Sequence, residues 1–214
     1  MITVTEVVKD IVKHSPFLEE GLSRNLINLS SLARQIQPEV RKKLLKDIEL
    51  GAIVMSLKRL TNVLKENDLK SKKITDLVSD LTVRSNLIEF TYSNSPVLID
   101  KITLFMHTLE KDKNYFITFS QGVYETTIFA SSSLEEKIEE VFKGEALKAK
   151  FKDLSSITLI LPPESVYLPG AYYSILKKLA WHGISFVEVI SSFTELTIFL
   201  EKQNVDQAFS VLKN

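Results

Sequence analysis

The fold is indicated by a pentamer that occurs twice, as Glu125-Thr126-Thr127-Ile128-Phe129 and, 70 residues later, as Glu195-Leu196-Thr197-Ile198-Phe199. Four of the five positions are identical. The same offset, without a gap, aligns apolar residues of 85–143 with apolar residues of 155–213, so that Phe105 falls on Ile175 and Phe119 on Val189. Because a chance pentamer would not bring its surroundings into phase, the sequence predicts a duplicated unit. The alternative is two unrelated α+β units with similar patterning.

Both copies show the same order of predicted elements. In the second copy, Pro162-Pro163 ends a β-rich run and Gly183 ends an amphipathic helix. Four residues separate the next two strands, which predicts an antiparallel hairpin. The predicted strands are 157–161, 184–190 and 195–200, with helices 171–182 and 205–212; in the first copy they are 87–92, 115–120 and 124–130, with helices 97–110 and 133–143. Each copy is thus βαββα with a closing strand expected after its second helix, and the fold class is α+β with two tandem ferredoxin-like units.

The stretch from Tyr167 to Glu188 resembles an ACT domain. That family typically shows a Pro-Gly loop, a helix ending in Leu-Ala and a Gly-Ile break into the next strand, which correspond here to Pro169-Gly170, Leu179-Ala180 and Gly183-Ile184. Tandem copies at a carboxyl end resemble the regulatory half of aspartate kinases, although nothing in this sequence resembles the kinase catalytic domain. The first copy departs from the pattern, because its loop, 93–97, contains no glycine.

The resemblance implies a site for a small ligand, often an amino acid, where the first loop of one copy meets a neighbouring copy. The chemistry of the loop suits this role, because glycine lets a ligand approach the backbone and N–H groups at a helix start can meet a carboxylate. Glu164 could pair with an ammonium group, and Ser165 or Tyr167 could add a hydrogen bond. The candidate ligand-binding residues are Glu164, Ser165, Tyr167, Leu168, Pro169, Gly170 and Ala171. The alternative is that Pro169-Gly170 only makes the turn.

Residues 1–73 predict a separate, mostly helical domain. They carry a net charge of +5, whereas residues 74–214 carry −5. Apolar spacing predicts helices near 3–13, 17–22, 32–36 and 49–64, with Ser30 or Ser31 as a cap and Pro38 opening a new turn. Together with strand-like segments between 74 and 92, this order resembles a winged-helix unit. Candidate phosphate-binding cations are Arg41, Lys42, Lys43, Lys46, Lys58 and Arg59, for which a solvated helix surface is the alternative interpretation.

Several kinds of chemistry are not expected. The chain has no cysteine, which excludes disulfides and thiolate catalysis. His14, His107 and His182 lack metal-ligand spacing, and no phosphate-binding or nucleophile motif occurs. We therefore expect no enzyme, metal or cofactor. No apolar run approaches the roughly 18 residues that cross a membrane, and the amphipathic N-terminus is unlike a secretory signal, so a cytoplasmic location is expected.

Two functions follow from these patterns. The first is a non-catalytic regulatory protein that senses a small ligand, expected to be an amino acid, as a homodimer; with the basic domain it would be a one-component transcriptional regulator that binds DNA. The second is a structural or dimerisation module, or a detached regulatory subunit of an amino-acid biosynthetic enzyme such as aspartate kinase, for which exposed edge strands are suited. The expected domains are 1–73, 74–153 and 154–214.

Overall fold

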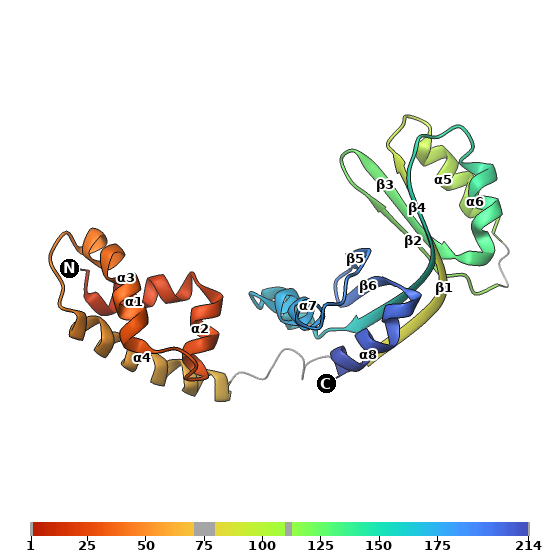
Figure 1. Cartoon of the computed structure of the whole chain (residues 1–214). Coiled ribbons are helices and arrows are strands. Elements are labelled where there is room, and N and C mark those ends of the chain that lie inside the picture. The colour runs from red at the N-terminus through yellow and green to blue at the C-terminus, as the bar shows by residue number, and fades with distance from the viewer. Residues whose placement is uncertain (1, 71–79, 110–112, 214) are drawn as a thin grey trace. The chain divides into compact units, whose positions relative to one another are not determined.

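The structure, a computed structural model, describes residues 2–70, 80–109 and 113–213 (Figure 1). Helices and strands separate along the chain into two units, Met1–Lys72 and Lys73–Asn214. Only helices occur in the described part of the first unit, whereas the second is built on one antiparallel sheet.

The first unit consists of α1 (Val4–Lys13), α2 (Pro16–Ser23), α3 (Leu29–Leu44) and α4 (Leu50–Lys70). A capping box starts α1, because the Thr3 side chain accepts from the Glu6 amide while the Glu6 carboxylate accepts from the Thr3 amide. Apolar residues at helical spacing then converge on one core, which includes Val8, Val12, Leu22, Leu32, Ile36, Val40, Ile53 and Leu57.

Helix α3 corrects the prediction of two short segments. It runs unbroken through Pro38, and its cap is Asn28, whose side chain accepts from the Ser31 amide at 3.0 Å. An internal proline costs about 3 kcal/mol through the lost hydrogen bond. Here Ile36 and Val40, on either side of the proline, are both buried in the core, and this tertiary burial outweighs local preference. The wing expected between 74 and 92 is also revised, because residues 80–92 lie in the sheet of the second unit and residues 2–70 contain no strand.

The second unit contains a six-stranded antiparallel sheet in the order β2-β3-β1-β4-β6-β5. Its strands are β1 (Asp80–Ser93), β2 (Ile117–Gln121), β3 (Glu125–Ser131), β4 (Leu147–Ile160), β5 (Glu188–Ser191) and β6 (Glu195–Glu201). The central strands β1 and β4 are each 14 residues long and pair along their length. Both strands therefore run through the two halves of the sheet. Strand β4 continues without a break across residues 153 and 154, where the sequence predicted the boundary between the two copies.

Each half of the sheet carries two helices. In the first half, α5 (Leu98–His107) and α6 (Glu135–Val141) pack on β2, β3, the end of β1 and the start of β4. In the second, α7 (Ala171–Trp181) and α8 (Val205–Lys213) pack on β5, β6, the end of β4 and the start of β1. The strand that lies beside β4 in the second half is thus contributed by residues 80–84, not by residues after the last helix as the repeat predicted.

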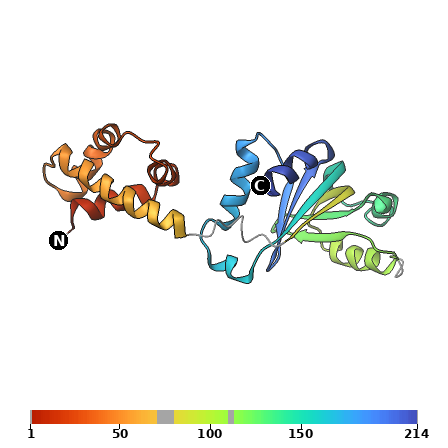
Figure 2. The ribbon, with the colours of Figure 1, turned by 90° about the horizontal axis from the view of Figure 1, so that it is seen from below.

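Among residues 80–109 and 113–213, no helix lies on the opposite face of the sheet, which curls onto itself (Figures 1 and 2). Its centre is an apolar cluster of Leu87, Phe129, Leu154 and Phe199. The rings of Phe129 and Phe199, the last residues of the repeated pentamers, stack with centroids 3.6 Å apart. The helix-free faces of the two halves therefore contact each other through Phe129 and Phe199, which occupy equivalent positions of the repeat. We call the region between these two faces the inside of the curl.

Two backbone irregularities keep all four helices on one face. Asn86 and Asp153 have positive φ values, 59° and 54°, in the middle of β1 and β4, and the pairing register shifts beside them. As a consequence, the residues that face the helices change from odd to even positions along β1, as Leu81 and Ile88 show. Along β4 they change from even to odd positions, as Lys150 and Ile157 show. An inserted residue of this kind is a β-bulge, and asparagine and aspartate tolerate the left-handed conformation better than other side chains.

The structural repeat has a variable offset. The long strands start at 80 and 147, which is an offset of 67, whereas β3 and β6 start at 125 and 195, an offset of 70. The first helices, α5 and α7, start at 98 and 171, an offset of 73. The gapless alignment is therefore correct from the hairpin onward and wrong on the first strand and the first helix, where it places Phe105 on Ile175. The second copy is longer between its first strand and first helix, where a 3-10 turn, η3 (Pro163–Tyr167), is found.

Candidate functional site

The candidate ligand loop of the second copy is a succession of tight turns between β4 and α7. The Ser165 amide donates to the Pro162 carbonyl at 2.9 Å, the Leu168 amide to Ser165 at 3.1 Å and the Ala171 amide to Leu168 at 3.2 Å. Prolines before and after the turn restrict the backbone further. The loop is therefore an ordered surface feature that can present side chains in fixed positions.

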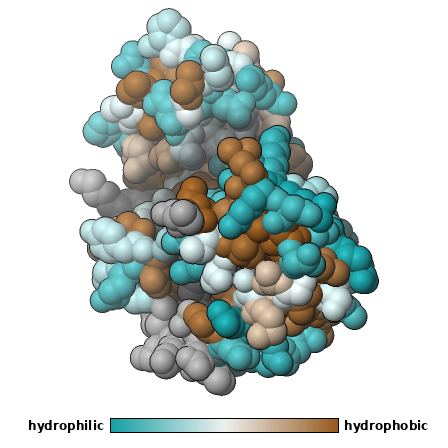
Figure 3. Space-filling model, turned by 90° about the vertical axis from the view of Figure 1, so that its left-hand side faces the viewer, coloured by the Kyte–Doolittle hydropathy of each residue, from teal (hydrophilic) through white to brown (hydrophobic). Residues whose placement is uncertain are grey.

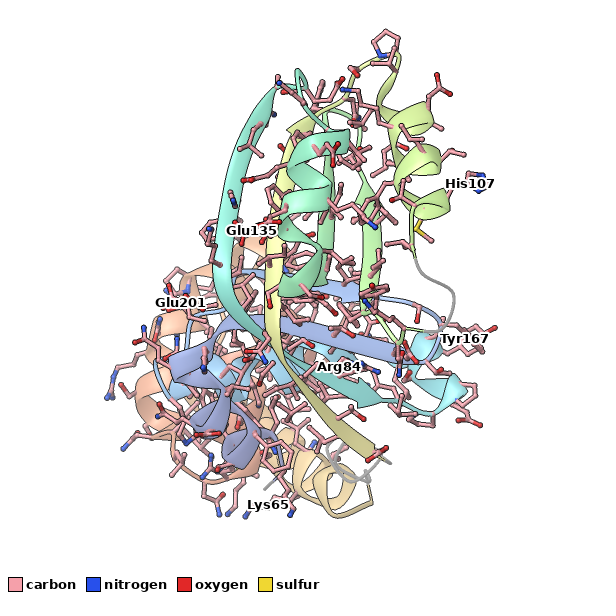
Figure 4. The ribbon with its side chains drawn as sticks, turned by 90° about the vertical axis from the view of Figure 1, so that its right-hand side faces the viewer. Lys65, Arg84, His107, Glu135, Tyr167 and Glu201 are labelled. Carbon is pink, nitrogen blue, oxygen red and sulfur yellow. The ribbon has the colours of Figure 1, made fainter. Side chains whose placement is uncertain are left out.

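The candidate residues divide into an exposed and a buried set. Tyr167 is 86% exposed and projects away from the sheet (Figure 4), and Glu164, Leu168, Pro169 and Gly170 are exposed as well. Ser165 and Ala171 are buried, at 6% and 5% exposure. A ligand outside the loop can meet the first set directly, whereas Ser165 is buried, so the hydrogen bond expected from it is not accessible at the surface.

Gly170 starts α7 in a left-handed conformation with φ of 83°. A Cβ atom at this position would contact no other atom within 4 Å, so the glycine is required by its backbone angle and leaves open space in front of the helix. The first turn of α7 presents the Tyr172 and Tyr173 amides, for which the described residues supply no backbone acceptor. Such amides, with the helix dipole, favour an anionic group.

The equivalent loop of the first copy is closed by side chains from the loop itself, from α5 and from the segment between α6 and β4. The Ser95 hydroxyl donates to Glu145 at 2.6 Å, and the Lys101 ammonium contacts the same carboxylate at 3.0 Å and the Lys143 carbonyl at 2.6 Å. The Glu145 side chain is only 7% exposed, and the Ser95 and Lys101 bonds hold its pKa below the usual value. Sequence analysis missed Glu145, because it lies 50 residues from Ser95.

The candidate cations of the first unit fall into two groups. Arg41 pairs with Asp47 at 2.8 Å, and Lys43 pairs with Asp10 at 2.8 Å and Glu39 at 3.2 Å. The Lys43 ammonium lowers the pKa of Asp10. Lys42, Lys46, Lys58 and Arg59 are exposed and form no ion pair with any described residue. In the view of Figure 3, hydrophilic and hydrophobic residues alternate over the surface.

The histidines occupy helix ends. Ring nitrogens of His14 and His182 contact the carbonyls of Asp10 and Lys178, both at 2.8 Å, and His107 is exposed at the end of α5 (Figure 4). Across residues 2–70, 80–109 and 113–213, no three acidic or histidine side chains are arranged to hold a metal ion. No helix in the same ranges is long and apolar enough to span a membrane.

No protein-family model matches the chain, and no curated protein matches its sequence. Solved structures match in fold. The aspartate kinases of Clostridium acetobutylicum and Synechocystis superpose with TM-scores of 0.53 and 0.52 over 64% of this chain, at 13% and 15% identity. The regulatory subunit of aspartate kinase from Thermus thermophilus superposes with a TM-score of 0.51 over 64% of this chain at 9% identity.

The extent of each match differs in the other chain. It covers 34% and 26% of the Clostridium and Synechocystis kinases, so this chain spans about a third or less of their length. It covers 96% of the Thermus regulatory subunit. The resemblance to the regulatory part of aspartate kinases is therefore confirmed for the fold of the curled sheet.

Proposed function

We propose that this chain is a regulatory protein whose second unit is a pair of ACT-type units and senses a small zwitterionic ligand at residues 164–171. The contrast between its two loops carries the proposal. The first loop is filled by the Ser95–Glu145–Lys101 contacts, whereas the second has open space at Gly170. Amides without a backbone acceptor among the described residues occur in the first turn of both α5 and α7, so the contrast lies in the side chains around the two loops. A ligand carboxylate would accept from the α7 amides, and Glu164 would pair with the ligand ammonium.

A thermal-denaturation screen with the twenty amino acids tests this function. A ligand selective for the folded state raises the melting temperature by an amount that grows with concentration. We expect one or a few amino acids to do so, and Glu164→Gln to abolish the rise. Glu136→Gln, an exposed carboxylate on α6, is the matched control. No response to any amino acid, or equal responses of both variants, would contradict the proposal.

A detached regulatory subunit is the second candidate. This candidate is supported by the match to the regulatory subunit of aspartate kinase from Thermus thermophilus, of which 96% is covered. That protein is a regulatory subunit in a chain of its own, and the match accounts for nearly all of it. Edge strands β2 and β5 are each paired on one side only, so they offer backbone groups to a second copy or an enzyme. Sedimentation would detect a dimer, and co-purification with an aspartate kinase from the same cells would favour this role over an independent sensor.

The first unit suggests the output of the sensor. Lys42, Lys46, Lys58 and Arg59 are available to contact phosphates, because no described carboxylate neutralises them. On this proposal the chain retards DNA in a gel at low salt, and the effect falls steeply as salt increases. Lys58→Gln with Arg59→Gln should weaken retardation, whereas Arg41→Gln, whose partner is Asp47, should weaken it less.

A further inference from the structure

The inside of the curl contains carboxylates without cationic partners. Glu89 on β1 is only 4% exposed. Its Oε1 atom accepts from the Thr91 hydroxyl at 3.0 Å, but its buried Oε2 atom has no hydrogen-bond partner. Glu188, at the start of β5, lies close enough that its charge, after burial, raises the pKa of Glu89. A buried carboxylate oxygen without a donor is unfavourable, so this arrangement requires an explanation.

The hydroxyl groups around the two carboxylates supply too few protons. The Thr91 hydroxyl donates to Glu89 and lies 3.0 Å from the Thr127 hydroxyl, which also bonds to Glu188. Each hydroxyl has one proton. If Thr91 donates to Glu89, then Thr127 can donate to Thr91 or to Glu188 but not to both. Glu89 Oε2 and one further acceptor are left without a donor.

Neither Glu89 nor Glu188 forms an ion pair with a cation of the described residues. Two cations of the sheet make other contacts: Arg84 lies over the Phe116 ring, and Lys148 pairs with Glu125 at 3.1 Å. Glu125 itself adds to the negative potential, because after burial its charge raises the pKa of Glu188. The carboxylates of Glu89 and Glu188, one from each half of the sheet, would therefore be stabilised by a positively charged group that carries hydrogen-bond donors.

A hollow of about 210 Å³ lies inside the curl, between β2 on one side and β5 and β6 on the other. Neither Glu89 nor Glu188 lines it, but Glu188 is the cross-strand partner of Phe199, which does. Ile190, which also lines the hollow, is two residues after Glu188 on the same face of β5, a spacing of about 7 Å. The other lining side chains include Phe116, Thr118, Thr197 and Phe199, and the one carboxylate among them is Glu195.

The aromatic wall of the hollow is already suited to cations. The Arg84 guanidinium lies over the Phe116 ring, 5.6 Å from its centroid (Figure 4 labels Arg84). Aromatic faces attract ammonium and guanidinium groups, and more so where water is excluded. Threonine hydroxyls beside the rings can accept or donate hydrogen bonds to a polar substituent.

We propose that the inside of the curl binds a small organic cation, with an ammonium group between Glu89 and Glu188 and a short body in the hollow beside Phe116 and Phe199. An ammonium has three donors, which satisfy Glu89 Oε2, Glu188 and one threonine oxygen together. A metal ion suits the site less well, because no three acidic or histidine side chains of the described chain surround one point. The site is separate from residues 164–171 and does not depend on the function proposed for them.

The test is a titration of the full chain with n-butylammonium chloride, with n-butanol as the uncharged probe of the same size. In ¹H–¹⁵N NMR spectra we expect saturable shifts at the amides of Ile190 and Phe199 with the amine and none with the alcohol. Glu188→Gln should weaken amine binding at least tenfold, and Glu136→Gln should leave it unchanged. Glu89→Gln should also lose binding while it raises the melting temperature of the free protein.

Three outcomes would overturn the proposal. They are shifts that do not saturate, shifts that are equal for amine and alcohol, and equal affinities of Glu188→Gln and Glu136→Gln. The titration of the unaltered protein locates the site even if a glutamate variant fails to fold. Amino-acid responses that are lost in Glu164→Gln but kept in Glu188→Gln would show that the loop and the inside of the curl act as independent sites.

Discussion

Replacing Phe129 by alanine should selectively destabilise the curled sheet. The ring is fully buried and stacks on Phe199 at a centroid distance of 3.6 Å, within a cluster that joins the two halves. Truncation of a fully buried phenylalanine costs about 3–5 kcal/mol, because apolar contacts are lost and a cavity remains. With a denaturant dependence of about 2 kcal/mol per molar urea, the unfolding midpoint should fall by roughly 2 M.

The single tryptophan makes the measurement specific. Trp181 lies on α7 of the second unit, with the Lys177 ammonium 4.9 Å from its ring. Its fluorescence therefore follows unfolding of the sheet, while circular dichroism follows both units. Phe193→Ala is the control, since Phe193 is 68% exposed between β5 and β6, and its effect should stay within about 0.5 kcal/mol.

A double-variant cycle sharpens the test. Phe199→Ala alone should cost about as much as Phe129→Ala, because both rings are equally buried. The pair should cost less than the sum by about 0.5–1.5 kcal/mol, the usual strength of an aromatic contact. A cost under about 1 kcal/mol for Phe129→Ala, or strict additivity, would refute the view that the halves are joined through these rings.

Three further changes test other parts of the structure. Asn28→Ala removes the side-chain cap of α3 and should destabilise the first unit by about 1 kcal/mol, measured by far-ultraviolet circular dichroism; a neutral effect would argue against the cap. Gly170→Ala forces a Cβ into the left-handed region and should destabilise the sheet unit by about 1–2 kcal/mol in Trp181 fluorescence, although no atom obstructs it; an unchanged midpoint would contradict the backbone angle. Burial and the charge of Glu188 raise the pKa of Glu89 in the folded state, so the folded chain keeps this proton at a higher pH than the unfolded chain does. Stability should therefore fall as pH rises above the ordinary pKa of a glutamate and through the raised pKa of Glu89. Calorimetry should show this fall reduced in Glu89→Gln, and an identical pH dependence in both proteins would exclude Glu89 as its source.

Much of the sheet unit is predictable because its local patterns agree with its tertiary contacts. Strands β3 and β6 are short runs that are buried at nearly every residue, and short turns join each to its neighbour, so their composition and spacing locate them. The helices after them, α6 and α8, follow from the helical spacing of their apolar residues. In the first unit, the same reasoning fails at Pro38, because the burial of Ile36 and Val40 is a tertiary effect that a local rule does not contain.

The long strands could not be predicted in the same way. The start of β1 pairs with residues 156–160, which are more than 70 positions away, so no local pattern identifies its partner. The bulges at Asn86 and Asp153 reverse which residues face the helices, and a gapless repeat cannot represent them. The contact of Ser95 with Glu145, and the isolation of Glu89, likewise depend on strand pairing rather than on sequence spacing.

The sharing of β1 and β4 between halves has a consequence for synthesis on the ribosome. Residues 80–84 emerge early, but their partners on β4 emerge only after the whole first half, and that segment of β4 in turn pairs with β6, which emerges later still. Until then the start of β1 is an unpaired strand edge that other nascent chains can bind. Slow, non-local closure of this kind predicts that the yield of native protein depends more on chaperone capacity than the size of the chain alone would suggest.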